Sequence, residues 1–415
     1  MVRQRSTELT PKAHNGNIIV GLDVGTTKIC AVVGELSETG VEIHAVGTSA
    51  STGLRKGVVV NIDSTVESIK NAANEAKSLT GFEINTVYVG ITGGHIKGFN
   101  SYGAVGVRGK EVTYMDIDRV IDSAKAVYVP LDREVLHVIP TGYILDGQNG
   151  IRDPVGMAGV RLESNVHIVT GAVTSVQNLL KCCEKAGLDV IDIVFEPLAS
   201  AEAILTDDEK ELGVAIVDIG GGTTDIILYK DGWLRHVSVL AIGGNHFTND
   251  IAVGFRIPVS EAERIKKSFG SAATSMASDS EEIDIIQAGH ERKVPRRCLL
   301  EIIQPRTEEL LDLIKSELLS CAGYDIASSG VVFTGGGSLL NGLDRIAEVL
   351  LGLPVRIGFP ENIERCEGSI RNPIYATGVG LVLYGFTTVS NRKIYHDTFA
   401  GIVGKMKGWV KEIFR

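Results

Sequence analysis

The chain has 415 residues, of which 44% are hydrophobic and 22% charged, and its formal net charge is −10. This length exceeds the size at which one hydrophobic core usually stops growing, so we expect two or more domains. No apolar run is long enough to cross a bilayer, and the acidic balance argues against nucleic acid as a partner. The six cysteines form no Cys-x-x-Cys pair, which fits a reducing, cytosolic setting.

The first 16 residues are polar and lack the apolar middle of a secretory signal, so we interpret them as a flexible tail. The apolar run 18–23 then ends at an acid, and a glycine-containing turn leads into a second apolar run, 29–33. This pattern predicts strand, tight turn, strand. The same pattern returns at 214–229, which indicates two halves of common ancestry rather than a short-period repeat.

Helical spacing of apolar residues alternates with these strands at 64–79, 173–186, 197–205 and 304–321, so the fold class is α/β. Residues 86–166 interrupt the first half with strand patterns around one helical stretch, 115–127, and we expect an inserted α+β subdomain there. A second insertion, 257–304, contains a low-complexity run and a basic cluster. The expected division is 17–85, 167–203 and 372–386 for the first domain, 204–256 and 305–371 for the second, 387–398 for a linker and 399–415 for a terminal helix.

The first turn suits phosphate. Gly25 lets the backbone approach an anion, the hydroxyls of Thr26 and Thr27 can donate to it, and Lys28 adds positive charge. Asp23 ends the preceding strand and suits the water shell of Mg²⁺, which often takes only one or two carboxylates.

The second turn has the same chemistry. Asp218 is the counterpart of Asp23, and a loop of three glycines and two threonines follows it: Gly220, Gly221, Gly222, Thr223 and Thr224. Either motif alone can be an ordinary hairpin turn. Two of them in this order predict a clamp on one polyphosphate.

A third glycine cluster, Gly335, Gly336, Gly337 and Ser338, lies between a strand pattern and the helical stretch 343–351. Bare backbone at such a junction can accept a flat base. An ordinary strand-to-helix turn is an equal alternative.

Together, the three segments resemble the actin-like ATPase superfamily over residues 18–384. The resemblance implies two facing domains that bind ATP and Mg²⁺, with the third cluster at the adenosine. It also places Glu196 at the position of a residue that orients the attacking water and makes Asp218 the other catalytic candidate. An equally good interpretation is that Glu196 is only an acidic residue at the start of a helix, before Pro197. Glu263 and Lys266 match a helix that contacts the adenosine, although such residues more often lie on the solvent-exposed face of a helix.

The C-terminal segment carries an apolar stripe at helical spacing. It comprises Phe399, Ile402, Val403, Met406, Trp409, Val410, Ile413 and Phe414. The segment also contains four basic residues and only one acidic residue, Glu412; the basic residues are Lys405, Lys407, Lys411 and Arg415. A basic amphipathic end on an acidic chain is typical of an interfacial membrane helix. The alternative is a helix that docks on its own protein, and three glycines indicate that the segment folds only when bound.

These features together resemble the FtsA family of bacterial actin-like division proteins, as do the segment 156–163 and the strand pattern 166–170. The resemblance implies self-association, tethering of the FtsZ division ring to the cytoplasmic face of the membrane at the septum, and recruitment of other division proteins. It also places the C-terminal peptide of FtsZ on the second insertion, where Arg292, Lys293, Arg296 and Arg297 cluster. Guanidinium groups suit the carboxylates of such a peptide, and a solvated charged loop is the alternative.

Two other functions remain open. A small-molecule kinase of the same superfamily would need a carboxylate to deprotonate its acceptor and would have no use for the amphipathic end. A PilM-like pilus protein would share the cleft and the insertion but lack that end. We expect slow ATP hydrolysis at most.

Overall fold

The computed structural model describes residues 18–37, 40–278, 280–287, 289–320, 327–361, 363 and 370–395, with side chains described only to residue 388. The predicted tail 1–16 and the predicted amphipathic helix 399–415 therefore lie outside the described residues. Among the described helices, none is long and apolar enough to cross a membrane.

The first half is built on a five-stranded sheet with strand order β11-β6-β1-β2-β3. The three strands β1, β2 and β3 pair antiparallel, whereas β1, β6 and β11 run parallel. The predicted first hairpin is confirmed as β1 and β2. The strands are β1 (Ile18–Val24), β2 (Lys28–Leu36), β3 (Val41–Ala50), β6 (Thr86–Ile91) and β11 (Asp189–Phe195), and a small ribbon is formed by β4 (Leu54–Arg55) and β5 (Val58–Val59).

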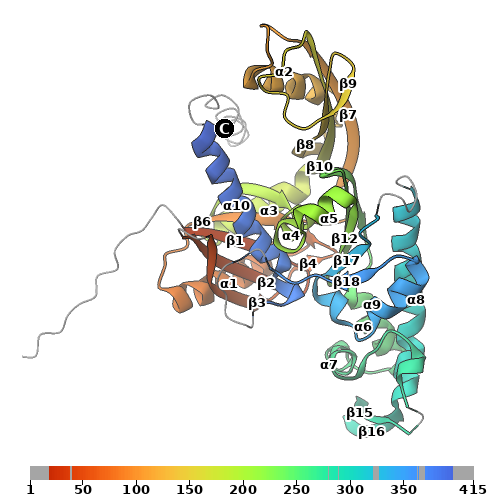
Figure 1. Cartoon of the computed structure of the whole chain (residues 1–415). Helices are drawn as coiled ribbons and strands as arrows, with labels where there is room; N and C mark the ends of the chain where they lie inside the picture. Colours follow the sequence, from red (N-terminus) through yellow and green to blue (C-terminus); the bar gives the residue numbers. More distant parts are fainter. Residues whose placement is uncertain are drawn as a thin grey trace, which may run out of the picture.

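The helices of the first half pack around this sheet (Figure 1). The first of them, α1, begins at Asn61, whose side chain accepts from Ser64 N, and ends at Gly81 in the left-handed conformation. A capping asparagine and a terminal glycine satisfy backbone groups that a helix cannot pair internally. The helices are α1 (Ile62–Thr80), α3 (Val173–Lys185), α4 (Glu196–Ile204) and α10 (Ala376–Tyr395).

The second half repeats this topology in the order β14-β13-β12-β17-β18. Again three strands pair antiparallel and two more add in parallel, so the predicted duplication is visible strand by strand. The strands are β12 (Val214–Ile219), β13 (Thr224–Lys230), β14 (Trp233–Leu240), β17 (Val331–Thr334) and β18 (Val355–Ile357). The helices are α5 (Asp207–Leu212), α6 (Gly244–Phe255), α7 (Val259–Phe269), α8 (Arg296–Ser320) and α9 (Leu343–Leu351), with short 3-10 turns η1 (Thr274–Met276), η3 (Gly336–Leu339) and η4 (Pro373–Tyr375).

Two insertions depart from this repeat, and Figure 1 shows them at opposite ends of the molecule. One forms a four-stranded sheet, in the order β7-β10-β8-β9, covered by a single helix. Its elements are β7 (Lys97–Gly106), α2 (Tyr114–Lys125), β8 (Arg133–Leu145), β9 (Gln148–Ile151) and β10 (Arg161–Ala172). The other insertion contributes α7 and a hairpin of β15 (Glu282–Gln287) and β16 (His290–Pro295).

Three predicted boundaries differ from the structure. The first insertion begins after β6 and not at residue 86, because β6 pairs in parallel with β1 and β11 in the sheet of the first half. Helix α8 begins at Arg296, eight residues before the predicted start, because Leu299, Leu300 and Ile303 continue its buried face and Pro305 lies inside it. Helix α10 continues to Tyr395 through most of the predicted linker, since a helix that is nucleated by packing extends readily into polar sequence.

Candidate functional site

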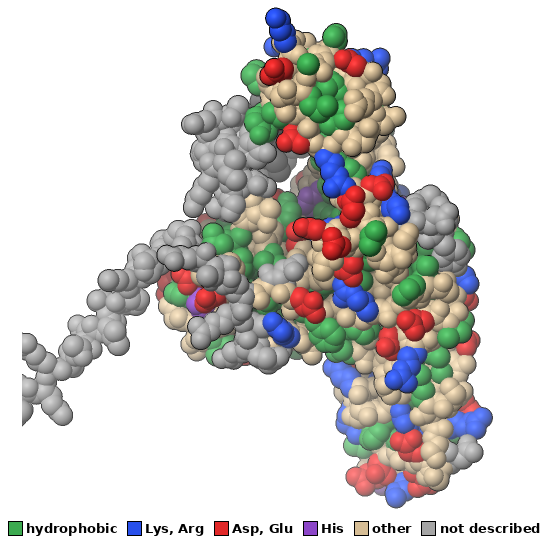
Figure 2. All heavy atoms as spheres, viewed as in Figure 1, with side chains coloured by type: hydrophobic (Ala, Val, Ile, Leu, Met, Phe, Trp, Pro, Cys, Tyr) green, Lys and Arg blue, Asp and Glu red, His purple; other side chains and the backbone are tan. Residues whose placement is uncertain are grey.

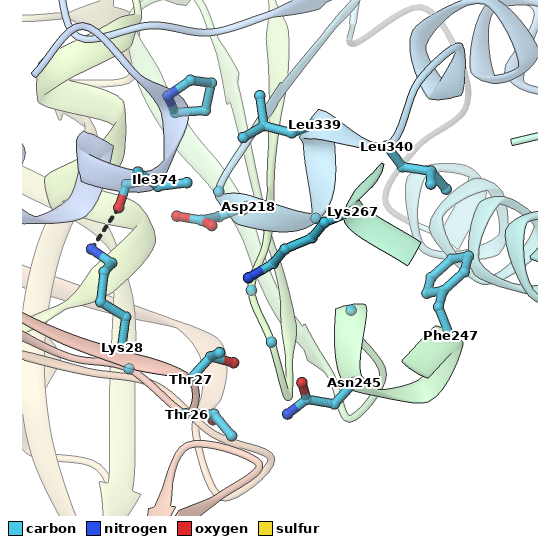
Figure 3. Close-up of a pocket in the computed structure, with 18 of the residues that line it drawn as sticks. Thr26, Thr27, Lys28, Asp218, Asn245, Phe247, Lys267, Leu339, Leu340 and Ile374 are labelled. Carbon is cyan, nitrogen blue, oxygen red and sulfur yellow. Dashed lines mark hydrogen bonds between the residues drawn. The ribbon is translucent and has the colours of Figure 1, made fainter. Parts of the chain in front are cut away.

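The first predicted phosphate loop is the turn between β1 and β2. Thr26 accepts a hydrogen bond from Gly57 N at 3.0 Å. Lys28 Nζ donates to the carbonyl of Ile374 at 2.8 Å, as Figure 3 shows, and lies 3.7 Å from Asp23 Oδ2. The turn therefore presents hydroxyls and one ammonium group above a buried carboxylate.

The second loop, between β12 and β13, faces the first at close range. A Cβ at Gly221 would overlap Thr27 Oγ1, and a Cβ at Gly222 would lie 2.8 Å from Thr26 Oγ1. Glycine is required here because the two loops meet without room for a side chain. Thr224 is turned away, since its hydroxyl donates to the carbonyl of Ile242 at 2.8 Å.

The third glycine cluster closes the site from the second half. Gly335 has φ +79°, and a Cβ there would overlap Asp218 Oδ1 and lie 2.7 Å from the carbonyl of Ile219. Gly336 is open, because its nearest neighbour would be Ile374 Cγ2 at 3.7 Å. The Ser338 hydroxyl donates to the Gly335 carbonyl at 2.7 Å, so this predicted ligand residue stabilises the turn.

These three segments line one cavity of about 670 Å³ between the two halves. Figure 3 shows side chains from both halves around it. Of the predicted cofactor-binding residues, Gly222, Thr224 and Ser338 do not line the cavity, and all the others do. The sequence did not indicate the other lining residues, which are Thr92, Asp225, Gly244, Asn245, Phe247, Lys267, Ser268, Gly270, Leu339, Leu340, Asn341, Pro373, Ile374 and Thr377.

Glu263 and Lys266 form part of the cavity wall and not a solvated helix face. Lys266 Nζ lies 2.6 Å from Glu263 Oε2 and donates to Thr248 Oγ1 at 2.8 Å and to the Gly244 carbonyl at 3.0 Å. Lys266 thus joins α7 to the start of α6 beside the cavity. The interpretation of Glu263 and Lys266 as a solvent-exposed helix face was wrong, because the packing of α6 against α7 decides how exposed they are.

Four buried carboxylates line the cavity and interact with one another: Asp23, Glu196, Asp218 and Asp225. Burial raises the pKa of Asp218 to about 6, although the hydrogen bond from Ser200 at 2.8 Å opposes the rise. Burial also raises the pKa of Glu196 and that of Asp225 well above their ordinary values. For Glu196 the charges of Asp23, Asp225 and Asp218 add to this effect.

This crowding suits a divalent cation with phosphate, since a nearby cation offsets the repulsion among carboxylates. Within the described residues, no group of three or more His, Cys, Asp or Glu side chains forms a direct metal site. Mg²⁺ bound through water and phosphate oxygens does not need one. The predicted pair, Asp23 and Asp218, is therefore suited to hold the water shell of a Mg²⁺ ion bound to nucleotide phosphates.

The predicted basic cluster is divided by the fold. Arg296 lines the cavity, where its guanidinium donates to the Phe269 carbonyl at 2.8 Å, to Ser271 at 2.7 Å and to Glu281 at 2.9 Å. Arg292, Lys293 and Arg297 are exposed. Figure 2 shows acidic and basic side chains together at the end of the molecule that β15 and β16 form, and Lys293 Nζ lies 4.0 Å from Glu282. Arg296 is thus engaged within the protein.

The duplicated sheets, facing phosphate loops and shared cavity define this chain as an actin-like protein. Solved structures of this fold are similar to it. A PilM-PilN type IV pilus biogenesis complex superposes with a TM-score of 0.66 at 19% identity, covering 88% of this chain and 98% of that one. MreB 5 of Spiroplasma citri bound to AMPPNP gives 0.57 at 18% identity, covering 91% and 99%.

Comparison with relatives narrows the class. Residues 215–380 match the family described as Cell division protein FtsA, and residues 93–170 match the SHS2 domain inserted in FtsA. The chain is 44% identical to the Cell division protein FtsA of Pseudomonas aeruginosa over 97% of this chain and 99% of that protein. It is 38% identical to that of Escherichia coli K12, over 97% and 98%. The chain belongs to the FtsA family of cell division proteins.

Proposed function

We propose that this chain is an ATP-binding scaffold that assembles with copies of itself and tethers the FtsZ ring to the cytoplasmic face of the membrane at the septum. The observation that carries the proposal is the single cavity in which phosphate loops of both halves meet. A ligand held by both loops favours one relative orientation of the two halves, because its affinity differs from one orientation to another. ATP then acts chiefly as a conformational ligand.

Within the cavity, the two hairpin loops would hold the phosphates and the bare backbone of Gly336 would face the base. Bound Mg²⁺ would neutralise phosphate charge, with Asp23 and Asp218 holding its water shell. Glu196 would orient a water for hydrolysis. Burial raises the pKa of Glu196 well above its ordinary value, and we expect slow turnover.

Nucleotide binding is tested with the purified chain, Mg²⁺ and a fluorescent ATP analogue. We expect saturable binding that Asp218→Ala weakens at least about tenfold, the effect of losing roughly 1.4 kcal/mol of interaction. Asp189→Ala serves as a control, since Asp189 is an exposed carboxylate at the start of β11. Equal affinity of wild type and Asp218→Ala would contradict the assignment of the second loop.

Membrane tethering is tested by flotation with vesicles that contain anionic lipid. We expect the full chain to float and to carry FtsZ with it, and a chain that ends at Thr398 to remain at the bottom. The proposed contribution of Trp409 and its apolar neighbours is checked with Trp409→Glu, which keeps the chain length. Equal flotation of the full and shortened chains would contradict tethering by the C-terminal segment.

We propose that the C-terminal peptide of FtsZ binds at Arg292, Lys293 and Arg297, because Arg296 is engaged within the protein. All three are exposed, Arg292 and Lys293 on β16 and Arg297 at the start of α8. We expect the double variant Arg292→Ala with Lys293→Ala to weaken capture of that peptide in a salt-dependent way. Other division proteins would dock elsewhere, and the inserted sheet is the surface we propose for them.

A further inference from the structure

A second, much smaller cavity lies beside the nucleotide cavity. Its volume is about 10 Å³, close to the space that one water molecule needs. Glu196 and Thr92 line both cavities, and His95 lines only the smaller one. The Glu196 side chain therefore lies between the proposed nucleotide site and this second space.

Two buried polar atoms that line the small cavity have no hydrogen-bond partner among the described residues, namely His95 Nε2 and Glu196 Oε1. Each lies beside a glycine: a Cβ at Gly93 would be 3.2 Å from His95 Nε2, and a Cβ at Gly90 would be 3.2 Å from Glu196 Oε1. A buried polar group without a partner is costly, and such groups in native proteins are usually satisfied by ordered water.

The tautomer of His95 follows from its other nitrogen. The backbone N–H of Ala172 donates to His95 Nδ1 at 3.3 Å, so the neutral ring carries its hydrogen on Nε2. Burial, together with the Arg133 guanidinium, lowers the pKa of His95, which keeps the ring neutral near pH 7. The small cavity is thus lined by one N–H donor and by one carboxyl oxygen that can accept.

The turn that carries His95 is fixed to the root of the inserted sheet. Arg133, the first residue of β8, donates through Nη2 to the carbonyls of His95 and Thr170, each at 2.8 Å. Thr170 belongs to β10, and Ala172 ends that strand. Both partners of this turn, Arg133 and Ala172, therefore come from strands that continue into the inserted subdomain.

We propose that the small cavity is a buried water site, in which the water accepts from His95 Nε2–H and donates to Glu196 Oε1. His95 is then a positioning residue: it fixes Glu196 through the water and links the nucleotide cavity to the root of the inserted subdomain. The role toward Glu196 in nucleotide turnover rests on the proposed function, whereas the water site itself does not.

The water site is tested first by ¹⁵N NMR of the histidine rings in the full chain without nucleotide. We expect His95 to be neutral with hydrogen on Nε2, and its Nε2 signal to move in Glu196→Gln while the signals of His44 stay in place. His44 is a suitable reference because it lies on β3 and pairs with Glu35. A hydrogen on Nδ1, or an Nε2 signal unchanged in Glu196→Gln, would overturn the proposal.

A double-mutant cycle in urea unfolding, again without nucleotide, measures the link directly. We expect His95→Leu and Glu196→Leu to be non-additive, with a coupling of about three- to tenfold in the unfolding constant, typical of one hydrogen-bonded connection. His95→Gln, which keeps a donor at similar reach, should restore most of the wild-type value. Additive effects within about twofold would overturn the link.

The functional consequence is measured on the same variants with Mg-ATP. We expect His95→Leu to lower the turnover rate about three- to tenfold with little change in ATP affinity, His95→Gln to recover it, and His44→Leu to match wild type. Equal turnover in His95→Leu and wild type would overturn the positioning role. If the wild-type chain bound no ATP, the proposed function would fail, and the NMR experiment and the cycle would still decide the water site.

Discussion

The third glycine cluster allows a paired test, because adding one methyl group at adjacent positions should affect different properties. At Gly335 an alanine would have to adopt φ +79° and would overlap Asp218 and the Ile219 carbonyl. The combination of positive φ with ψ 169° is essentially restricted to glycine and costs about 1–3 kcal/mol for other residues, and overpacking adds about 1–3 kcal/mol. We therefore expect Gly335→Ala to lower the free energy of unfolding by about 2–6 kcal/mol.

At Gly336 the same methyl group has space, since only Ile374 Cγ2 would be within 4 Å, at 3.7 Å. The free energy of unfolding should change by less than about 1 kcal/mol. The added Cβ would, however, occupy the region proposed for the base. Overpacking against the ligand by about 1–3 kcal/mol corresponds to roughly 5- to 150-fold weaker ATP binding.

Both variants are measured by urea unfolding without nucleotide and by titration with a fluorescent ATP analogue. We expect Gly336→Ala to be stable but to bind ATP weakly, and Gly335→Ala to be unstable. Wild-type affinity in Gly336→Ala would show that the base lies elsewhere. Wild-type stability in Gly335→Ala would refute the packing of this turn on Asp218.

Three further predictions concern the charged residues. The pKa of Asp218 is raised in the folded protein, so the contribution of this carboxyl to stability falls as pH rises through about 6. Without nucleotide, the free energy of unfolding of Asp218→Asn should therefore increase by about 1–2 kcal/mol relative to that of wild type between about pH 5 and about pH 7.5. A constant difference between the two in urea unfolding would contradict this. Arg296→Ala should lower the free energy of unfolding by about 1–3 kcal/mol because it leaves Glu281 and buried carbonyls unpaired. Arg292 is exposed, so Arg292→Ala should change the free energy of unfolding by less than about 0.5 kcal/mol in the same assay. Equal losses would refute the division of the basic cluster. Thr92→Val should raise the pKa of Asp225 further, because it removes the hydrogen bond at 2.7 Å that favours the charged form, and NMR titration of the Asp225 carboxyl carbon checks this.

Local patterns were sufficient to predict the two hairpins. In each, a buried apolar run ends at an acid and a glycine turn reverses the chain, so the strand pair and the loop both follow from adjacent residues. The register confirms this: Asp23 pairs with Cys30 and Asp218 pairs with Asp225. The duplication could be recognised because both copies keep the same local pattern.

The role of a charged side chain could not be predicted in this way. Arg296 and Arg292 stand four residues apart in one basic run, yet one is enclosed by Phe269, Ser271 and Glu281 while the other is exposed. Asp225 lies beside the predicted loop, but its hydrogen bond with Thr92 depends on the residue that follows β6 in the other half. Such contacts are long-range, and sequence spacing does not contain them.

The positions of the two insertions make the ends of the molecule unlike each other. The inserted sheet follows the fourth strand of its half, whereas α7 and the β15–β16 hairpin precede the fourth strand of theirs, and Figure 1 places them far apart. Contacts between two unlike ends, if copies of the chain made them, would generate open rows of subunits when no rotation closes them. The insertions thus give the duplicated body a direction, and a row built from it would grow at two ends that differ.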